Sequence, residues 1–431
     1  MERYINRVVD AVIEKKLKVT GAVVIRGPKW CGKTRSAKEY AKSEIDLQNV
    51  ETADDYKKVA ENDIALLLEG DKPRLIDEWQ EIPKIWNAVR SDVDKQDKSG
   101  LYILTGSTTP KDNETKNLHS GIGRLSYVDM KPMTLYESGD SNGSISLKDI
   151  VENKIKIRGQ KSDINYQRLA FLTCRGGWPS AVNKKDEEIA LDVAKEYVNA
   201  LCESDITKID DVARNPELTR NILRSYARQI STIDSDKALF DDIKYNFGSV
   251  SNASLYEYIN ILKRLFVIDE TMAWNPNLRS KTAIRTSPKK AFVDPSIATA
   301  ALDISPKELA LDPNTFGLFF ENLVNRDLSV YANKIGGHLR HYRDRTGLEC
   351  DHVIHFNNGK YGLIQTKLGA SEIEQGIEKL REIKRLIKEK NAGKKKPVIK
   401  EPDFMMVING YDLAYTTTDG IFVVPIGCLK D

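Results

Sequence analysis

The stretch that decides the fold lies near the start of the chain, at residues 21–37, and reads GAVVIRGPKWCGKTRSA. Its first part, AVVI at residues 22–25, is short, apolar and rich in β-branched side chains, which predicts a buried strand. A glycine-bounded loop follows, and a helical pattern begins after it. The spacing GxxxxGK[ST] between a strand and a helix is typical of a phosphate-binding loop.

The chemistry of phosphate binding explains this spacing. The loop must turn its backbone N–H groups toward phosphate oxygens, and glycine permits that close approach. We expect Lys33 to reach the β- and γ-phosphates and Thr34 to bind Mg²⁺, at a helix N-terminus that favours negative charge. The residues expected to contact the nucleotide are Gly27, Pro28, Lys29, Trp30, Cys31, Gly32, Lys33 and Thr34. The sequence therefore predicts a site for ATP or ADP with Mg²⁺.

A second strand, residues 73–77, ends in two carboxylates, Asp77 and Glu78, 44 positions after Lys33. Nucleotide hydrolases carry such a pair, the Walker B pair, at this place. Asp77 would then hold Mg²⁺ through water and Glu78 would polarise the attacking water. The apolar run before the pair is short, so a surface turn is the alternative.

The next predicted strand, residues 101–107, reads LYILTGS and ends in small polar side chains. Ligands bind at the carboxyl edge of such sheets, so Thr105 or Ser107 could sense the γ-phosphate or position the water. A simple strand-ending turn fits nearly as well.

A polar loop, residues 108–120, precedes GIGR, which ends at Arg124. An arginine here could act as a finger on the γ-phosphate of its own or a neighbouring subunit, and we expect the neighbour, hence a homo-oligomer. An ordinary surface arginine is the alternative.

Composition limits the class of protein. The 431 residues carry 30% charged side chains but a net charge of only +3, so any basic surface must be local. The five cysteines form no C-x-x-C pair, which argues against a disulfide framework or zinc site and suits a reducing cytosol. No apolar run approaches the ~18 residues of a membrane span. We expect a soluble, cytoplasmic protein without a membrane partner.

A series of motifs in this order carries a family resemblance: GPKWCGKT, LIDEWQEIP, LYILTGS, GIGRLSYVDMKPMTLYE and RGGWPSAV. The chain resembles prokaryotic ATPases of the AAA superfamily that have an uncharacterised C-terminal module. KKAFVDPSIA, FFENLV and YRDRTGLECDHVI extend the resemblance over nearly the whole chain. It implies an α/β ATPase domain with a parallel sheet, followed by a winged helix and a small restriction-endonuclease-like α/β domain.

We place these parts at about residues 1–150, 151–300 and 301–431. The middle part shows helical periodicity at 189–202, 218–230 and 253–266, followed by two β-prone pieces at 267–274 and 290–293, as in a winged helix. The outward face of 253–266 is only mildly basic. DNA contact and a scaffold or protein-docking role therefore both stay open.

The last part contains a second candidate site. Residues 349–356 and 361–367 alternate as strands, and 316–331 has helical periodicity. Glu321, Asp351 and Lys367 match the metal-dependent nuclease pattern, in which carboxylates hold Mg²⁺ and a lysine stabilises charge. Gln365 stands where that pattern has an acid, so metal affinity should fall. A decayed fold kept for binding is the alternative. Lysines between residues 388 and 400 fit a solvated loop or a phosphate-backbone contact.

The leading hypothesis from the sequence is an ATP-binding, ATP-hydrolysing protein that acts on or near DNA through its C-terminal domains. One alternative is a nucleotide switch whose inert nuclease-like domain docks a protein partner. The other is an ATP-gated nuclease, with defence as one role open to it.

Overall fold

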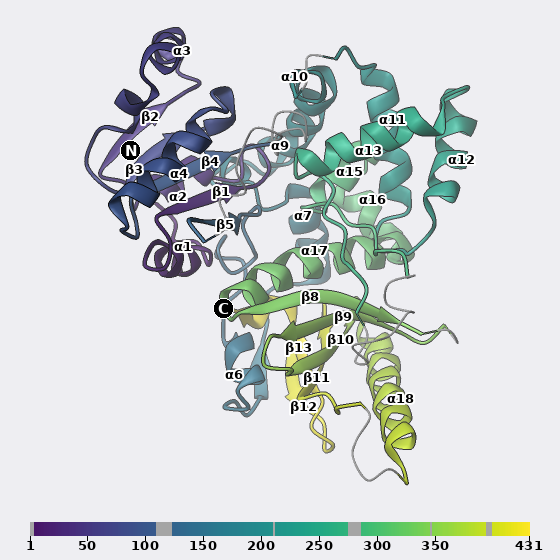
Figure 1. Cartoon of the computed structure of the whole chain (residues 1–431). Coiled ribbons are helices and arrows are strands. Elements are labelled where there is room, and N and C mark those ends of the chain that lie inside the picture. The colour runs from purple at the N-terminus through teal and green to yellow at the C-terminus, as the bar shows by residue number, and fades with distance from the viewer. Residues whose placement is uncertain (1–3, 109–122, 210–211, 275–285, 345–346, 394–398) are drawn as a thin grey trace. The chain divides into compact units, whose positions relative to one another are not determined.

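The computed structural model describes residues 4–108, 123–209, 212–274, 286–344, 347–393 and 399–431 (Figure 1). The chain divides into two compact units. Unit 1 comprises Met1–Pro132 and Asn260–Val267, and unit 2 comprises Met133–Ile259 and Ile268–Asp431. The three-domain division stays a prediction. Most of the polar loop before Arg124 and several of the lysines near residue 395 lie outside the described residues. Within the described part, no helix combines the length and apolar character needed to cross a bilayer.

Unit 1 is built on a five-stranded parallel sheet in the order β2-β3-β4-β1-β5. Its strands are β1 (Ala22–Arg26), β2 (Ser43–Asp46), β3 (Arg74–Asp77), β4 (Tyr102–Gly106) and β5 (Leu125–Asp129). Its helices are α1 (Asp10–Leu17), α2 (Lys33–Lys38), α3 (Ala53–Asn62) and α4 (Ile85–Gln96), with 3₁₀ turns at Ile64–Leu68 and Trp79–Glu81. The expected α/β class with a parallel sheet is confirmed.

The packing of strand β1 explains why its sequence is apolar at successive positions. Ala22 and Val24 belong to one buried cluster, and Val23 and Ile25 belong to another. Successive side chains of a strand point to opposite faces, so both faces of this sheet are covered. Both faces therefore exclude water around the strand that leads into the loop.

The first helix starts later than its sequence pattern indicates. Apolar residues at helical spacing predict a helix over residues 5–16, but α1 begins only at Asp10. The Asp10 carboxylate accepts hydrogen bonds from the Arg7 N–H (2.7 Å) and from the Tyr4 hydroxyl (2.8 Å). These bonds tie the segment before the helix to the first helical residue.

The first half of unit 2 is helical. Its helices are α6 (Leu147–Val151), α7 (Tyr166–Arg175), α8 (Pro179–Val182), α9 (Glu187–Ala200), α10 (Ile206–Lys208), α11 (Pro216–Arg228) and α12 (Asp236–Phe247), followed by α13 (Asn252–Arg264), whose last residues group with unit 1. The helices predicted at 189–202, 218–230 and 253–266 are confirmed within a few residues. In α13, Leu255, Ile259 and Leu262 are buried, as its periodicity predicts.

The two β-prone pieces after α13 pair with each other. Ile268 pairs with Phe292, and Thr271 pairs with Lys289, both antiparallel. A helical unit followed by such a pair has the order of a winged helix. That assignment stays a prediction.

The second half of unit 2 holds a seven-stranded mixed sheet in the order β7-β12-β13-β11-β10-β9-β8. These strands are β7 (Arg158–Lys161), β8 (Gly337–Arg343), β9 (Glu349–Phe356), β10 (Tyr361–Lys367), β11 (Phe404–Asn409), β12 (Leu413–Thr416) and β13 (Phe422–Pro425). A small separate sheet pairs β6 (Ile145–Ser146) with β14 (Leu429–Lys430). The helices are α15 (Ser296–Leu302), α16 (Pro306–Leu311), α17 (Pro313–Lys334) and α18 (Ile373–Asn391), of which α17 and α18 pack on the large sheet (Figure 1). The ranges predicted for β9 and β10 are confirmed to the residue.

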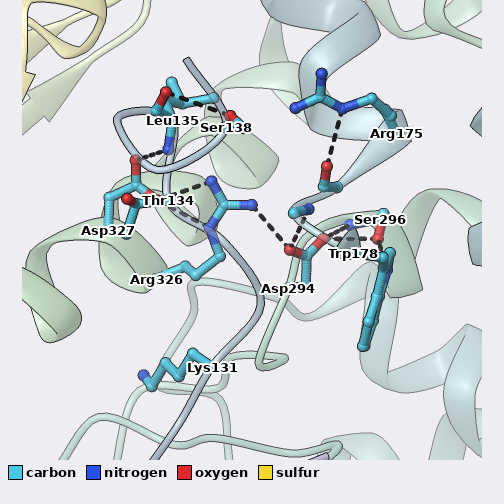
Figure 2. A network of polar contacts seen from close by, with 12 residues as sticks. Lys131, Thr134, Leu135, Ser138, Arg175, Trp178, Asp294, Ser296, Arg326 and Asp327 are labelled. Carbon is cyan, nitrogen blue, oxygen red and sulfur yellow. Dashed lines mark hydrogen bonds and ion pairs between the residues drawn. The ribbon is translucent and has the colours of Figure 1, made fainter. Parts of the chain in front are cut away.

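A buried ion network anchors α17 within unit 2 (Figure 2). The Arg326 guanidinium donates to Asp294 Oδ2 and to Asp327 Oδ1, each at 2.8 Å. Asp327 Oδ2 also accepts the Leu135 N–H at 2.9 Å, and Asp294 Oδ2 accepts the Gly177 N–H at 3.0 Å. The network therefore joins four segments that lie far apart in the sequence. Three of the motifs that carry the family resemblance contribute residues here, and Arg326 lies two positions after a fourth, FFENLV.

Candidate nucleotide site and a second carboxylate cluster

The loop between β1 and α2 has the backbone that a phosphate-binding loop needs. Gly27 has φ +157° and Gly32 has φ +100°, conformations that favour glycine. A Cβ on Gly27 would lie 2.1 Å from the carbonyl oxygen of Met130, so only glycine fits there. Trp30 also has a positive φ, at 64°, and its side chain is about half exposed at the loop tip. Pro28 is buried and Lys29 is half-buried.

The Lys33 side chain is buried within this loop. Its ammonium donates to the carbonyl oxygens of Gly27 (3.1 Å) and Pro28 (2.9 Å). Phosphate oxygens carry full negative charge and compete well with such carbonyls for an ammonium. Cys31 is buried beneath the loop, and burial raises the pKa of its thiol. Its place indicates packing rather than reactivity.

The sequence reasoning missed Arg7, which braces the loop. Its guanidinium donates to the carbonyl oxygens of Cys31 (2.8 Å) and Lys131 (2.7 Å), and the side chain is buried. An arginine at a predicted helix start gave no signal for this role, because only the tertiary fold brings it to the loop.

Asp77 lies beside Thr34, as the nucleotide hypothesis requires. The Thr34 hydroxyl donates to the Asp77 carboxylate at 2.9 and 3.1 Å. The Thr105 hydroxyl also donates to Asp77 Oδ1, and the Glu78 N–H donates to Thr105 Oγ1 at 3.0 Å. Burial raises the pKa of the Asp77 carboxyl, although both hydroxyls oppose that rise. β3 and β4 are neighbours, which explains why residues far apart in the sequence meet.

Glu78 follows with an unusual backbone and a fixed side chain. Its φ is +52°, which is uncommon for a residue with a side chain and clusters at functional sites. Glu78 Oε2 accepts the Ser107 N–H at 3.1 Å, the Ser107 hydroxyl at 2.9 Å and the Gln80 amide. Gln80 was not predicted; its only sequence signal is its place two residues after Glu78 in LIDEWQEIP.

These residues fit a bound Mg²⁺ ion. The Thr34 hydroxyl and the Asp77 carboxylate are hard oxygen donors in direct contact, next to a loop built for phosphates. Mg²⁺ usually binds through one or two such groups together with substrate phosphates and water. Among the described residues, no group of three His, Cys, Asp or Glu side chains could hold a metal by itself.

Arg124 lies at the amino ends of the parallel strands, opposite the carboxyl ends where the loop lies. It directly precedes β5, which runs parallel to β1 with Leu125 beside Ala22, whereas the loop follows the carboxyl end of β1. Its guanidinium pairs with Asp94 on α4 at 2.5 Å. The topology therefore gives no support to a role at its own nucleotide site, and action on a neighbour stays a prediction.

The second candidate site contains a residue that was not predicted. The Lys289 ammonium lies 2.6 Å from Glu321 Oε1 and 3.9 Å from Asp351 Oδ1, and also contacts the Asp351 carbonyl oxygen at 3.4 Å. Both of these acidic side chains are largely buried, and Lys289 is 7% exposed. Burial raises the pKa of Glu321, against the opposing effect of Lys289. Burial alone would lower the pKa of Lys289. Its two carboxylate neighbours raise the pKa by more than that, so the net shift is upward.

Gln365 and Lys367 lie on the neighbouring strand. The antiparallel register of Ile364 with His352 puts Gln365 opposite Asp351. Gln365 Nε2 donates to the Glu349 carbonyl oxygen at 2.9 Å, and Lys367 donates to Gln375 on α18 at 3.1 Å. The structure thus brings Glu321, Asp351 and Gln365 into one neighbourhood, while Lys367 is bonded to a different element.

This cluster does not fit a metal ion. A divalent ion between Glu321 and Asp351 would have to share that space with the Lys289 ammonium, a like charge. Lysine has three donors and no lone pair to offer a metal while it is protonated. The metal role predicted for these residues therefore gains no support from the geometry.

Comparisons with known proteins bear on the first site. Residues 19–138 match a family model described as an AAA domain. Residues 166–308 and 316–429 match two models described as domains of unknown function, DUF8612 and DUF4143. No curated protein matches the chain.

Several solved structures resemble the chain at low sequence identity. The Walker-type ATPase paby2304 of Pyrococcus abyssi has 13% identity and a TM-score of 0.43, over 69% of this chain and 96% of its own. The Aeropyrum pernix ORC1 protein in complex with DNA has 12% identity and a TM-score of 0.25, over 70% and 94%. Drosophila ORC bound to DNA has 14% identity and a TM-score of 0.19, over 69% and 85%.

The predicted AAA-type ATPase is thus confirmed for the N-terminal part, and residues 19–138 form an AAA-type ATP-binding domain. The winged helix and the nuclease-like domain stay predictions, because the models that match there name no fold or activity.

Proposed function

We propose that this chain, with its AAA-type ATP-binding domain, hydrolyses ATP through Asp77 and Glu78. The proposal is supported by two hydrogen-bond networks at the ends of β3 and β4, which the bond from the Glu78 N–H to Thr105 connects. One joins Thr34, Thr105 and Asp77, and the other joins Glu78 to Ser107. Two adjacent carboxylates beside a phosphate-binding loop are the arrangement that metal-assisted hydrolysis requires.

Each residue has a distinct task in this proposal. Thr34 and Asp77 would hold Mg²⁺, which supplies positive charge to the β- and γ-phosphates. Lys33 would exchange the two loop carbonyls for phosphate oxygens. Ser107 and Gln80 hold Glu78 by Oε2, so Oε1 is the oxygen that can take the proton of the attacking water.

A matched pair of variants tests the proposal. Lys33→Ala should lose ATP binding, because it removes the loop's charge on the phosphates. Glu78→Gln should bind ATP but hydrolyse it about 10³-fold more slowly, as expected when a general base is removed. Calorimetry measures binding, and phosphate release measures turnover. Lys38→Ala is the control and should change both little, because Lys38 lies on α2 beyond the loop and makes an exposed ion pair with Glu44. If Lys33→Ala binds ATP with wild-type affinity, the assignment of the loop is wrong.

We propose in addition that Arg124 acts on the γ-phosphate of a neighbouring subunit in a homo-oligomer. Its position at the amino edge of the sheet supports this, because it lies away from its own loop. Mixing Lys33→Ala with Arg124→Ala subunits should then recover part of the ATPase activity. A strictly monomeric protein with no recovery would exclude the idea.

A second candidate function is contact with DNA through unit 2. It is supported by the order of α11, α12 and α13 followed by the antiparallel pair at Thr271 and Lys289. The exposed side of α13 carries Tyr256, Asn260 and Lys263, and its Glu257 pairs with Arg214 at 3.0 Å, so the face is only mildly basic. A gel-shift titration at low salt tests this candidate. Absence of any shift would favour docking of a protein partner instead.

A further inference from the structure

We propose that Lys289 is a built-in counter-cation that takes the place of a metal ion between Glu321 and Asp351. In the protein as it stands, the lysine closes this pair of carboxylates to divalent metal. When Lys289 is replaced by a neutral side chain, the pair becomes a site for a divalent cation such as Mn²⁺. The proposal concerns unit 2 and is independent of the ATP site.

The backbone of Lys289 is fixed where the ammonium is needed. The Lys289 N–H donates to the Thr271 carbonyl oxygen, and the Thr271 N–H donates to that of Lys289, both at 2.9 Å. The Thr271 hydroxyl in turn donates to Asn325 Oδ1 on α17 at 2.7 Å. Asn325 lies one helical turn after Glu321, so the same face of α17 holds both the strand pair and the carboxylate.

A second asparagine of α17 fixes the same strand three residues further on. Asn322 Oδ1 accepts the Phe292 N–H at 2.9 Å, and its amide donates to the Phe292 carbonyl oxygen at 3.0 Å. Asn322 is fully buried, and so is Phe292. The backbone of the strand that carries Lys289 is therefore fixed to α17 at two points. This fixed backbone sets the position from which the Lys289 side chain reaches the two carboxylates.

Charge explains why a cation must be present here. Two largely buried carboxylates lie within reach of one another's field, and ionised groups in such surroundings need compensation. Lys289 supplies one positive charge at 2.6 Å from Glu321. Asp351 receives the Thr366 N–H at 2.8 Å on its other oxygen, which is a weaker form of compensation. A divalent ion would compensate both carboxylates.

The side-chain amide of Gln365, on the neighbouring strand, supports the same conclusion. Gln365 is fully buried, and within the described part of the chain its Oε1 has no hydrogen-bond partner. Buried polar atoms are rarely left without a partner. The two carboxylates, with this buried amide on the residue opposite Asp351, are hard-oxygen groups of the kind that suits Mn²⁺ or Mg²⁺ once the ammonium is gone.

The test uses the full chain and Mn²⁺ alone as the probe. The wild type, Lys289→Met and Lys289→Met/Asp351→Asn are titrated with Mn²⁺, and free ion is counted by electron paramagnetic resonance. The nucleotide site is common to all three proteins and cancels in the comparison. Lys289→Met should bind one more equivalent than the wild type, and the double variant should lose that equivalent.

Thermal stability gives a second readout. About 10 mM Mn²⁺ should raise the melting temperature of Lys289→Met by about 5 °C, the shift expected for a site saturated well above its dissociation constant. The double variant should show no such rise beyond that of the wild type. Equal Mn²⁺ binding and equal shifts in all three proteins would overturn the proposal.

A single variant that fails to fold also gives an answer. If Lys289→Met is recovered only in the presence of Mn²⁺, the ion replaces the lysine as proposed. If Mn²⁺ does not help, the triple variant Lys289→Met/Glu321→Gln/Asp351→Asn is compared. Folding of the triple variant would show that charge matters but metal cannot replace the lysine, and its failure would assign Lys289 to packing. Either result overturns the proposal.

Discussion

Asp77 in unit 1 and Asp327 in unit 2 are both buried carboxylates, but they differ in what compensates their charge. Among the described residues, the hydrogen bonds to the Asp77 carboxylate come from the neutral hydroxyls of Thr34 and Thr105. Asp327 is paired with the guanidinium of Arg326. A buried carboxylate that is paired with a cation of the protein needs no bound ion to balance its charge. One that has only neutral donors is suited to receive a cation from outside.

The second cluster of unit 2 lies between these two cases. Glu321 and Asp351 have a cation, Lys289, but fewer backbone donors than Asp294 and Asp327 have around Arg326. The comparison therefore ranks buried carboxylates by their compensation. Asp77 lacks a cation of its own, the Lys289 cluster has one cation and one backbone donor for its two carboxylates, and the Arg326 cluster has one cation and three backbone donors.

The largest expected effect comes from removing the cation of the Arg326 cluster. Arg326→Met leaves Asp294 and Asp327 buried without their cation, and should lower the free energy of unfolding by about 3 kcal/mol or more. Urea unfolding of the full chain measures it. Arg381→Met is the matched control, since Arg381 makes exposed ion pairs with Glu378 and Asp419 that solvent screens. If both variants lose the same small amount, the ranking by compensation is wrong.

Local pattern was enough to predict the strands and the nucleotide loop. Strands β3, β4, β9 and β10 lie where apolar runs or alternation predict them, because burial on one or two faces leaves a direct mark on the sequence. The contact of Thr34 with Asp77 also follows from the motif, since the parallel strands β1 and β3, with β4 between them, end at the same edge of the sheet.

Charge compensation could not be predicted in the same way. Lys289 lies 32 positions before Glu321 and 62 before Asp351, and the fold alone brings them together. The one signal was the pair Lys289-Lys290 at the start of the apolar strand KKAFV, since alternation sends two such neighbours to opposite faces. Arg7 and Gln80 were missed for the same reason: hydrogen bonds across a fold have no period in the sequence.

The smallest expected effect is a gain in stability. Asp77→Asn removes a buried charge that has only neutral donors, so without added nucleotide it should raise the free energy of unfolding by an amount on the order of 1 kcal/mol, a common result of relieving a functional site. The same variant should lose Mg²⁺-dependent ATP hydrolysis. Melting temperatures of the two proteins, with and without ATP and Mg²⁺, measure both effects.

The dependence of this gain on pH gives the sharper test. Burial raises the pKa of Asp77 in the folded protein above its ordinary value of 3.8. Below that value the carboxyl is protonated in both the folded and the unfolded chain, so the wild type and Asp77→Asn should have similar stability. As the pH rises through the folded pKa, the unfolded chain has already lost its proton and the folded chain must ionise a buried group, so the wild type loses stability. The advantage of Asp77→Asn should therefore appear as the pH rises from about 4 and reach a plateau by neutral pH. A variant that is less stable than the wild type at neutral pH would show that Asp77, like Asp327, needs no bound ion to balance its charge, and would remove the contrast between the two units.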